Sequence, residues 1–289
     1  MKNLSNIQIA KAIMNEKNFR TQKKLGQNFL MDESVLGDIL DAADVNKDDF
    51  VLEIGPGIGT LSDGICERAG KALLIEVDEK LIPILHENLQ EYDNVEIIND
   101  DVMKLNLIEL LSEKSEGRPV KIVANLPYYI TTPVLMKIIR GNVAYKSITV
   151  MVQKEVAERM EATPGTKAYG SLSLAVQFYT NPKIVEEVPA ERFFPAPKVD
   201  SCVIHMDRKT QKYSEEFSED LLFNVIKASF IQRRKSLYNG LANSPDLGLS
   251  KEDAKRIITS LGVEESIRGE RLGLEEFINL SVKIGAEKR

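Results

Sequence analysis

The stretch FVLEIGPGIGTLSDGICERAGKALLIE, residues 50–76, decides the fold of this chain. Its apolar start, residues 50–54, has the length and branched residues of a buried strand and runs directly into the glycine-rich turn at 55–59. Residues 60–69 then have helical spacing, and ALLIE at 72–76 predicts a second strand. A strand, a glycine-rich turn, a helix and another strand in this order predict the first unit of a parallel α/β sheet.

The same alternation continues after this stretch. Further strands are predicted at residues 95–98, 120–125 and 147–152, with helices at about 81–89 and 132–140 between them. Because strands alternate with helices, we expect a parallel sheet that is covered on both faces. Two more β-rich runs, KIVEEV at 183–188 and SCVIHM at 201–206, close this part of the chain around a cluster of prolines.

Strand signals end in the polar segment at about 207–214, and from about residue 215 the apolar residues have helical spacing. The sequence therefore predicts a basic N-terminal segment (1–24), an α/β domain (25–206) and a small all-helical domain (207–289).

Composition excludes several classes of protein. Apolar residues make up 43% of the 289 residues and charged residues 28%, as in ordinary globular proteins. No apolar run approaches the roughly 20 residues of a membrane span, and the first residues have no signal-peptide core, so we expect a cytoplasmic protein. Neither the two cysteines, Cys66 and Cys202, nor the histidines, His86 and His205, have the spacing of a disulfide framework or a zinc site, and we expect no metal.

Charge is distributed unevenly around a net charge of −6. Residues 1–24 carry six basic groups and one acid, residues 207–289 have a net charge of +1, and residues 25–206 have a net charge of −12. This pattern predicts basic patches on an acidic body. The alternative for the basic N-terminus is a solvated, partly disordered tail.

The glycine-rich turn is a candidate ligand site because open α/β sheets bind ligands beyond the carboxyl ends of their strands. Gly55 and Gly57 carry no side chain that would keep a ligand from the backbone, and Gly59 lets the next helix pack closely. A tight turn without a ligand is the alternative, since a glycine motif alone is weakly specific.

Acidic residues follow the next two strands. Glu76 ends the second strand, where its carboxylate can accept hydrogen bonds from both ribose hydroxyls of an adenosine. Asp100 and Asp101 follow the third strand, where either could accept an adenine amino group or simply cap a helix. The glycine spacing differs from the usual G-x-G-x-x-G of NAD sites. Together these features predict a nucleoside site.

The fourth strand runs into Asn125, Leu126, Pro127 and Tyr128, which suit an exocyclic amine such as that of adenine. The Asn125 side-chain oxygen and the Leu126 carbonyl can accept the two N–H bonds of the amine, and Pro127 fixes the turn. Tyr128 offers a face on which the base can stack and which stabilises developing positive charge. An Asn-capped turn with buried tyrosines is the structural alternative.

A base can enter such a pocket only when it is unpaired or flipped out, and a second aromatic side chain should then stack on it. The segment RFFPAPKVDS at 192–201 supplies two candidates. We expect Phe193 to stack on the base and Phe194 to lie in the core, with Lys198 near a phosphate.

Several motifs together resemble the ribosomal RNA adenine N6,N6-dimethyltransferases. These motifs are LGQNFL (25–30), EIGPGIG (53–59), NLPYY (125–129), YGSLS (169–173), FFPAPKVDS (193–201), FIQRRKSL (230–237) and RGERL (268–272), in the family's order. The resemblance covers the chain from about residue 20. It implies a Rossmann-like class I methyltransferase sheet with a small helical domain.

The resemblance also implies the cofactor and the reaction. S-adenosylmethionine would bind Asn28, Leu30, Gly55, Glu76, Asp101 and Asn125 and leave as S-adenosylhomocysteine. The substrate implied is a pair of adjacent adenosines in a hairpin loop near the 3′ end of 16S RNA in the assembling small subunit, and loss of this activity gives kasugamycin resistance in the family. Candidate RNA contacts are Lys23, Lys24, Lys198, Arg233, Arg234 and Lys235, and we expect a monomer.

Two alternatives remain open. Erythromycin-resistance methylases, which modify 23S RNA, share the glycine turn and the asparagine motif but differ in the helical part. A non-catalytic factor that binds the maturing ribosomal subunit is the rival from another class, although the presence of both the cofactor turn and Asn125–Tyr128 favours catalysis.

Overall fold

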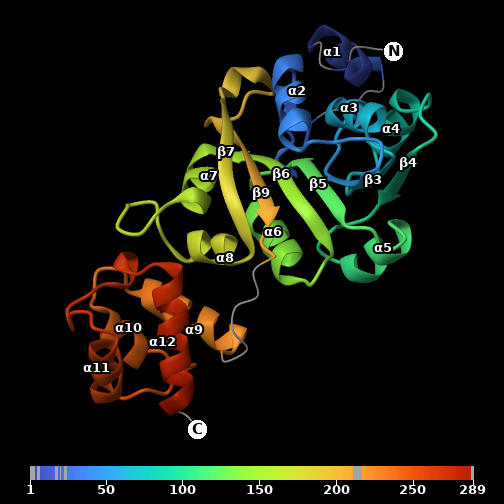
Figure 1. Cartoon of the computed structure of the whole chain (residues 1–289). Coiled ribbons are helices and arrows are strands. Elements are labelled where there is room, and N and C mark those ends of the chain that lie inside the picture. Colours follow the sequence, from blue (N-terminus) through green and yellow to red (C-terminus); the bar gives the residue numbers. More distant parts are fainter. Residues whose placement is uncertain are drawn as a thin grey trace. The chain divides into compact units, whose positions relative to one another are not determined.

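The computed structural model describes residues 4, 7–16, 19, 21–22, 25–210 and 217–287. Two compact units make up the chain (Figure 1): the first contains Met1–Ala157 and Asn181–Arg208, and the second contains Glu158–Thr180 and Lys209–Arg289. The change of unit after Arg208 lies close to the expected boundary at 206. Residues 158–180, which we expected in the α/β domain, group instead with the helices, because Leu174 and Phe178 are buried in the helical core.

A seven-stranded sheet with the order β4-β3-β2-β5-β6-β9-β7 forms the centre of the first unit. Its strands are β2 (Phe50–Ile54), β3 (Lys71–Glu76), β4 (Val95–Asn99), β5 (Val120–Asn125), β6 (Tyr145–Gln153), β7 (Thr180–Val188) and β9 (Ser201–Arg208). The pairs from β4 through β6 are parallel, and β9 runs antiparallel to β6. The predicted parallel sheet and its two closing strands are therefore confirmed.

Helices connect and flank these strands. They are α1 (Ile7–Glu16), α2 (Glu33–Ala42), α3 (Thr60–Arg68), α4 (Ile82–Asn88), α5 (Leu107–Lys114), α6 (Thr131–Arg140) and α7 (Lys154–Glu161). Asp32 caps α2, since its carboxylate accepts from the backbone N–H groups of Ser34 and Val35. Within the described residues, no helix has both the length and the apolar composition needed to cross a membrane.

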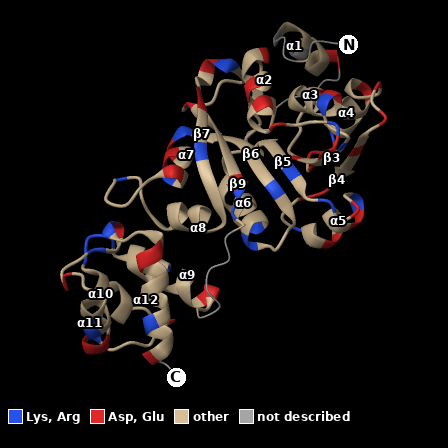
Figure 2. Ribbon diagram, in the orientation of Figure 1, with Lys and Arg blue, Asp and Glu red and all other residues tan. Residues whose placement is uncertain are grey.

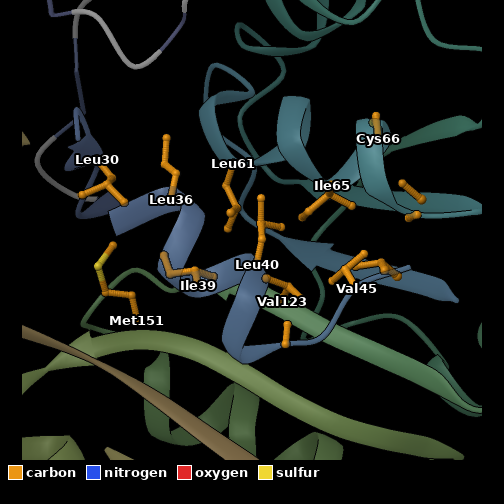
Figure 3. Packing of buried hydrophobic residues seen from close by; sticks show 14 of the residues in the cluster. Leu30, Leu36, Ile39, Leu40, Val45, Leu61, Ile65, Cys66, Val123 and Met151 are labelled. Atoms are coloured by element: carbon orange, nitrogen blue, oxygen red, sulfur yellow. The ribbon is translucent and has the colours of Figure 1, made fainter. Parts of the chain in front are cut away.

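Apolar residues of α2 and α3 pack on one face of the sheet (Figure 3). Leu36, Ile39 and Leu40 of α2 share a buried cluster with Val123 and Met151 of the central strands. Alternate strand residues such as Leu52, Ile122 and Val150 are fully buried as well. Because side chains alternate between the faces of a strand, both faces of the sheet are covered.

The N-terminal helix α1 also belongs to a packed cluster. Ile13 and Met14 are buried with Phe29 and Ile58, and Phe19 meets Phe29 edge to face with ring centroids 6.4 Å apart. The described part of the N-terminal segment is thus anchored by apolar contacts. A solvated, partly disordered tail would not make such contacts.

The second unit contains α8 (Ser171–Tyr179), α9 (Glu219–Ile231), α10 (Leu237–Ala242), α11 (Lys251–Ser260) and α12 (Leu274–Glu287). Ser218 and Ser250 cap α9 and α11 through side-chain hydrogen bonds. Tyr169 is completely buried among these helices, and its hydroxyl donates to the Leu272 carbonyl at 2.8 Å. A phenol inside a core requires such an acceptor, so this bond fixes the segment before α8 in the unit.

One buried cation anchors the edge of the sheet opposite the carboxyl ends of the parallel strands. The Lys121 side chain, on β5, is 2% exposed, and its Nζ lies 2.8 Å from Asp49 Oδ2 and 3.6 Å from Asp44 Oδ2. Asp49 is itself 12% exposed, whereas Asp44 is 87% exposed. The Lys121–Asp49 pair therefore joins the loop before β2 to the start of β5.

Lys121→Met should lower the free energy of unfolding by about 3 kcal/mol, because Asp49 is then buried without a counter-charge. Urea unfolding followed by circular dichroism measures this change. Asp44→Asn is the control: it removes the exposed partner, keeps a residue tolerant of the positive φ at 44, and should have little effect. Equal losses from both substitutions would contradict the assigned importance of Asp49.

Candidate functional site

The strand order creates a crevice at the carboxyl ends of the parallel strands. The chain leaves β2 toward β3 and β4 on one side and later continues through β5 and β6 on the other. Ligands bind α/β sheets at such a reversal of strand order. A cavity lies there, and the first unit supplies all of its lining. The lining comprises residues 25–30, 36, 53–57, 60–61, 75–77, 81, 100–103 and 125–130.

The glycine-rich turn forms one wall of the cavity. Gly57 has a φ of 63°, in the left-handed region that favours glycine. A Cβ on Gly57 would lie 2.7 Å from the Phe29 ring. Backbone conformation and the close approach of Phe29 therefore both require glycine at this position, and the LGQNFL segment packs directly on the turn.

Glu76 joins this turn to the end of β3. Its carboxylate is 4% exposed and accepts the Gly57 N–H at 3.1 Å on one oxygen and the Asp78 N–H at 2.8 Å on the other. Burial raises the pKa of Glu76, and these backbone donors act in the opposite direction by stabilising the charged form. Two oriented oxygens that face a cavity can accept further hydrogen bonds from a pair of hydroxyl groups.

A second carboxyl group of the cavity lining was not assigned a function from the sequence. Glu53 of β2 is 1% exposed, and the Ser62 hydroxyl donates to it at 2.5 Å. Burial raises the pKa of Glu53 to about 8. Burial therefore favours the neutral form of this carboxyl group. Its position inside an otherwise apolar strand, FVLEI, is the sequence signal that could have identified it.

Asp100 and Asp101 both line the cavity after β4. Asp100 is exposed and accepts the Asp101 N–H at 2.7 Å, whereas Asp101 is half-buried and accepts the Met103 N–H at 2.9 Å. Each carboxylate thus stabilises the turn as an N-terminal cap would. Asp101, the residue expected at the cofactor adenine, is the more buried of the two.

Three exposed apolar side chains around the cavity were not anticipated. Val77, Met103 and Tyr129 are 48%, 38% and 54% exposed, and all three belong to the lining. Large apolar side chains that water reaches inside a cavity are typical of ligand sites. Val77 directly follows Glu76 and Met103 lies two residues after Asp101, so the sequence signal was an apolar residue just beyond each acid.

Asn125 lies at the end of β5 with a defined side-chain orientation. Its Nδ2 donates to the Asn28 carbonyl at 3.2 Å. A carbonyl oxygen can only accept, so this contact fixes which end of the amide is the nitrogen. The amide oxygen of Asn125 is the acceptor that remains for a ligand. Asn28 in turn donates through its own Nδ2 to the Gly26 carbonyl at 3.2 Å.

The residues after Asn125 continue the cavity wall. Leu126 is 1% exposed, and the Pro127 carbonyl accepts the Ile130 N–H at 3.1 Å, which closes the turn before α6. Tyr128 is half-buried, and its hydroxyl lies 2.7 Å from the Ser201 hydroxyl. Burial raises the pKa of Tyr128, so the phenol stays neutral at physiological pH. The ring therefore has one fixed edge and contributes to the cavity lining.

The expected exposure of Phe193 is wrong, and the expected burial of Phe194 is only partial. Phe193, expected to stack on a base, is 3% exposed and belongs to the core cluster, opposite Leu30 in the β1–β8 pair. Phe194, expected in the core, is half-buried. It packs against the cluster that contains Phe29 and Ile58, and the Lys11 ammonium lies 4.5 Å from its ring centroid. Side chains alternate along β8 (Phe193–Phe194), and pairing with β1 (Phe29–Leu30) determines which of them faces inward.

The expected RNA contacts differ in accessibility. Lys198 is exposed, whereas Lys23 and Lys24, like Lys17 and Arg20, lie outside the described residues. The helical spacing after residue 215 predicts Arg233, Arg234 and Lys235 on the first helix of the helical domain. They lie instead in the turn after α9, which ends at Ile231. Figure 2 marks basic residues on connecting loops of the second unit.

Arg233 differs from its two neighbours. Its Nε lies 2.8 Å from Glu270 Oε2, and another guanidinium nitrogen donates to the Thr166 carbonyl at 3.2 Å. Arg233 thus supports the fold of the second unit, whereas Arg234 and Lys235 are exposed. Across the part of the chain that the structure describes, no group of three or more His, Cys, Asp or Glu side chains is arranged to hold a metal ion.

Comparison with known proteins identifies relatives along almost the whole chain. The family profile described as ribosomal RNA adenine dimethylase matches residues 18–279. A protein of Lachnoclostridium phytofermentans named ribosomal RNA small subunit methyltransferase A is 51% identical over 270 residues, which cover 93% of each chain. The protein of the same name from Alkaliphilus oremlandii is 49% identical over 278 residues, which cover 96% of each chain.

Solved structures agree with this result. A dimethyladenosine transferase from Plasmodium falciparum is 25% identical, with a TM-score of 0.73 over 90% of this chain and 98% of that one. The 23S rRNA methyltransferase ErmE, at 22% identity, shares the fold with a TM-score of 0.69 over 89% of this chain and 100% of that one. The crevice at the carboxyl ends of the strands and the oriented Asn125 agree with the family profile, which spans residues 18–279. The chain therefore belongs to the ribosomal RNA adenine dimethylase family.

Proposed function

We propose that this protein transfers methyl groups from S-adenosylmethionine to the N6 amines of two adjacent adenosines in a hairpin loop near the 3′ end of 16S RNA, during assembly of the small subunit. The observation that carries the proposal is the Asn125 amide, held by the Asn28 carbonyl so that its oxygen is left for an amine. Relatives named small-subunit methyltransferases, at about half identity, favour 16S over 23S RNA as the substrate.

The cofactor fits the crevice by the chemistry of its lining. Glu76 would hold the ribose hydroxyls, and Asp101 would accept the adenine amino group, with Val77 and Met103 on the apolar faces of the ring. Gly55 and Gly57 allow the remainder of the cofactor to approach the backbone, and Asn28 and Leu30 close the opposite side. When bound, the cofactor supplies an electrophilic methyl group on a sulfonium centre.

The acceptor side of the site must orient a weak nucleophile. The lone pair of an adenine amine is delocalised into the ring, which makes the amine a weak nucleophile. The site must therefore hold the two N–H bonds so that the lone pair points at the methyl group. The Asn125 side-chain oxygen and the Leu126 carbonyl accept these two N–H bonds, and Tyr128 contacts the base through its ring face. No carboxylate base is needed, because the cationic product is acidic enough to lose its proton to water.

Charge determines which form of the RNA the protein can bind. Residues 25–206 have a net charge of −12 and repel a phosphate backbone wherever no local patch offsets them. Among the expected RNA contacts that the structure describes, Lys198, Arg234 and Lys235 are exposed, and three cations support modest affinity for arbitrary RNA. We therefore propose that the second unit docks on structured RNA of a partly assembled particle while the loop adenines enter the cavity.

Glu76→Ala should weaken S-adenosylmethionine binding by about 1.5–3 kcal/mol, the usual cost of losing hydrogen bonds to a charged group. Isothermal titration calorimetry on the folded variant measures the change. Glu67→Ala removes an exposed carboxylate from the same unit and should leave the affinity as it is. Unchanged affinity in Glu76→Ala would remove Glu76 from the cofactor site.

Asn125→Ala should lose most methyl transfer, about a hundredfold or more in kcat, while RNA affinity is largely retained, because the amine contact is a small part of a broad interface. Radiolabelled methyl transfer and a filter-binding assay separate the two quantities. In the same assays Tyr128→Phe, which keeps the ring face, should retain more activity than Tyr128→Ala. Parental activity in Asn125→Ala would exclude it from the mechanism.

Reversing Arg234 and Lys235 to Glu should abolish methylation of the small-subunit particle and leave cofactor affinity unchanged. Arg233 is kept, since its reversal would also break the contact with Glu270. Reversal of the exposed Lys183 and Lys251 changes the net charge equally and serves as the control. The docking proposal fails if the Arg234/Lys235 variant methylates particles normally, or if the parent methylates the isolated hairpin as efficiently as the particle.

A further inference from the structure

Asp78 carries a buried carboxylate for which the proposed reaction has no use. The residue lies two positions after Glu76 and is 3% exposed. Its Oδ2 accepts the side-chain amides of Gln22 and Gln27, each at 2.8 Å, and its Oδ1 accepts the Lys80 N–H at 3.2 Å. A buried charge needs such donors, and here two of them come from a segment more than 50 residues earlier in the chain.

The two glutamines are also bonded to each other. The Gln22 backbone N–H donates to Gln27 Oε1 at 2.6 Å, so Gln22, Gln27 and Asp78 form a closed ring of hydrogen bonds. In this ring each amide nitrogen meets the carboxylate, and the Gln27 amide oxygen meets a backbone donor. This pattern requires an acceptor at position 78 and side-chain donors at positions 22 and 27.

Asp78 connects both halves of the candidate site. Its backbone N–H donates to Glu76 Oε1 at 2.8 Å, on the cofactor side. Gln27, held by the Asp78 carboxylate, directly precedes Asn28, whose carbonyl accepts from Asn125 Nδ2 at 3.2 Å. A continuous path therefore runs from Glu76 through Asp78, Gln27 and Asn28 to the Asn125 amide.

We propose that Asp78 is a positioning residue: it holds Gln22 and residues 25–30 against the cofactor cavity and thereby fixes the Asn28 carbonyl that orients Asn125. The inference rests on the proposed function and deepens it. Asp78 is not among the residues that line the cavity, and it acts through Glu76 on one side and Gln27 on the other.

The hydrogen-bond pattern allows a test by exchange of donor and acceptor. Asp78→Asn keeps the size of the side chain but removes its charge and leaves one oxygen for three donors. In either orientation of the new amide, its NH₂ group faces other donors, which are the two glutamine amides or the Lys80 N–H. Gln27→Glu alone places a second carboxylate against Asp78. In the double variant, the new amide at position 78 can donate to the new carboxylate at position 27. It can also donate to the Gln22 amide oxygen after that amide rotates, and the Gln22 N–H keeps its acceptor.

Each single variant should lower kcat/KM for methyl transfer about ten- to a hundredfold, as expected for losing hydrogen bonds to a charged group, with kcat reduced as well as KM raised. The double variant should recover to within about threefold of the parent. Asp93→Asn, the same change at an exposed position, is the control. Parental kinetics in Asp78→Asn, or a double variant no better than the single ones, overturns the proposal.

Hydrogen exchange supplies a readout that does not require catalysis. Amides of residues 25–30 should exchange faster in Asp78→Asn than in the parent without cofactor, and slowly again in the double variant. If Asp78→Asn fails to fold, Gln22→Ala removes one donor outside the cavity lining and should give the same two effects in smaller measure. A parent that neither binds S-adenosylmethionine nor methylates RNA refutes the proposed function, whereas unchanged exchange refutes the role of Asp78.

Discussion

The site depends on the two hydrogen bonds that the Glu76 carboxylate accepts from backbone N–H groups. The carboxylate receives a backbone N–H from the turn after β2 and another from the residues after β3, so one buried side chain holds two neighbouring loops in register. Gly57 has a left-handed conformation in this contact, and the absence of a Cβ leaves room for the Phe29 ring beside the turn. The turn after β2, the end of β3 and Phe29 of the LGQNFL segment therefore meet at one wall of the cavity.

Periodicity and glycine spacing were sufficient to predict the sheet, its parallel strands and the position of the crevice, because these features depend on local pattern. Burial within the crevice was not predictable in the same way. The inward position of Phe193 is determined by its pairing with Leu30, which is far away along the chain. The role of Asp78 likewise depends on partners more than 50 residues away in the chain, and Arg233 meets Glu270 only through the tertiary fold.

Buried ionisable side chains have different partners at the two ends of the parallel strands. At the amino end, Lys121 is neutralised by Asp49, an arrangement that serves the fold. At the carboxyl end, Glu53, Glu76 and Asp78 are all nearly inaccessible, and burial raises the pKa of both glutamates. Such a concentration of carboxyl groups costs stability in the free protein, and a ligand that carries positive charge would offset part of that cost.

The second unit is built from two separate stretches of chain, with three strands of the first unit, β7, β8 and β9, between them. During synthesis, α8 leaves the ribosome well before its partners α9 and α12 exist, so its apolar residues Leu174 and Phe178 have no core to join until the C-terminal helices follow. The nascent chain must therefore keep this helix from aggregating while β7 and β9 complete the sheet. A chain that ended after β9 would therefore contain α8 without the C-terminal helices that bury its apolar residues.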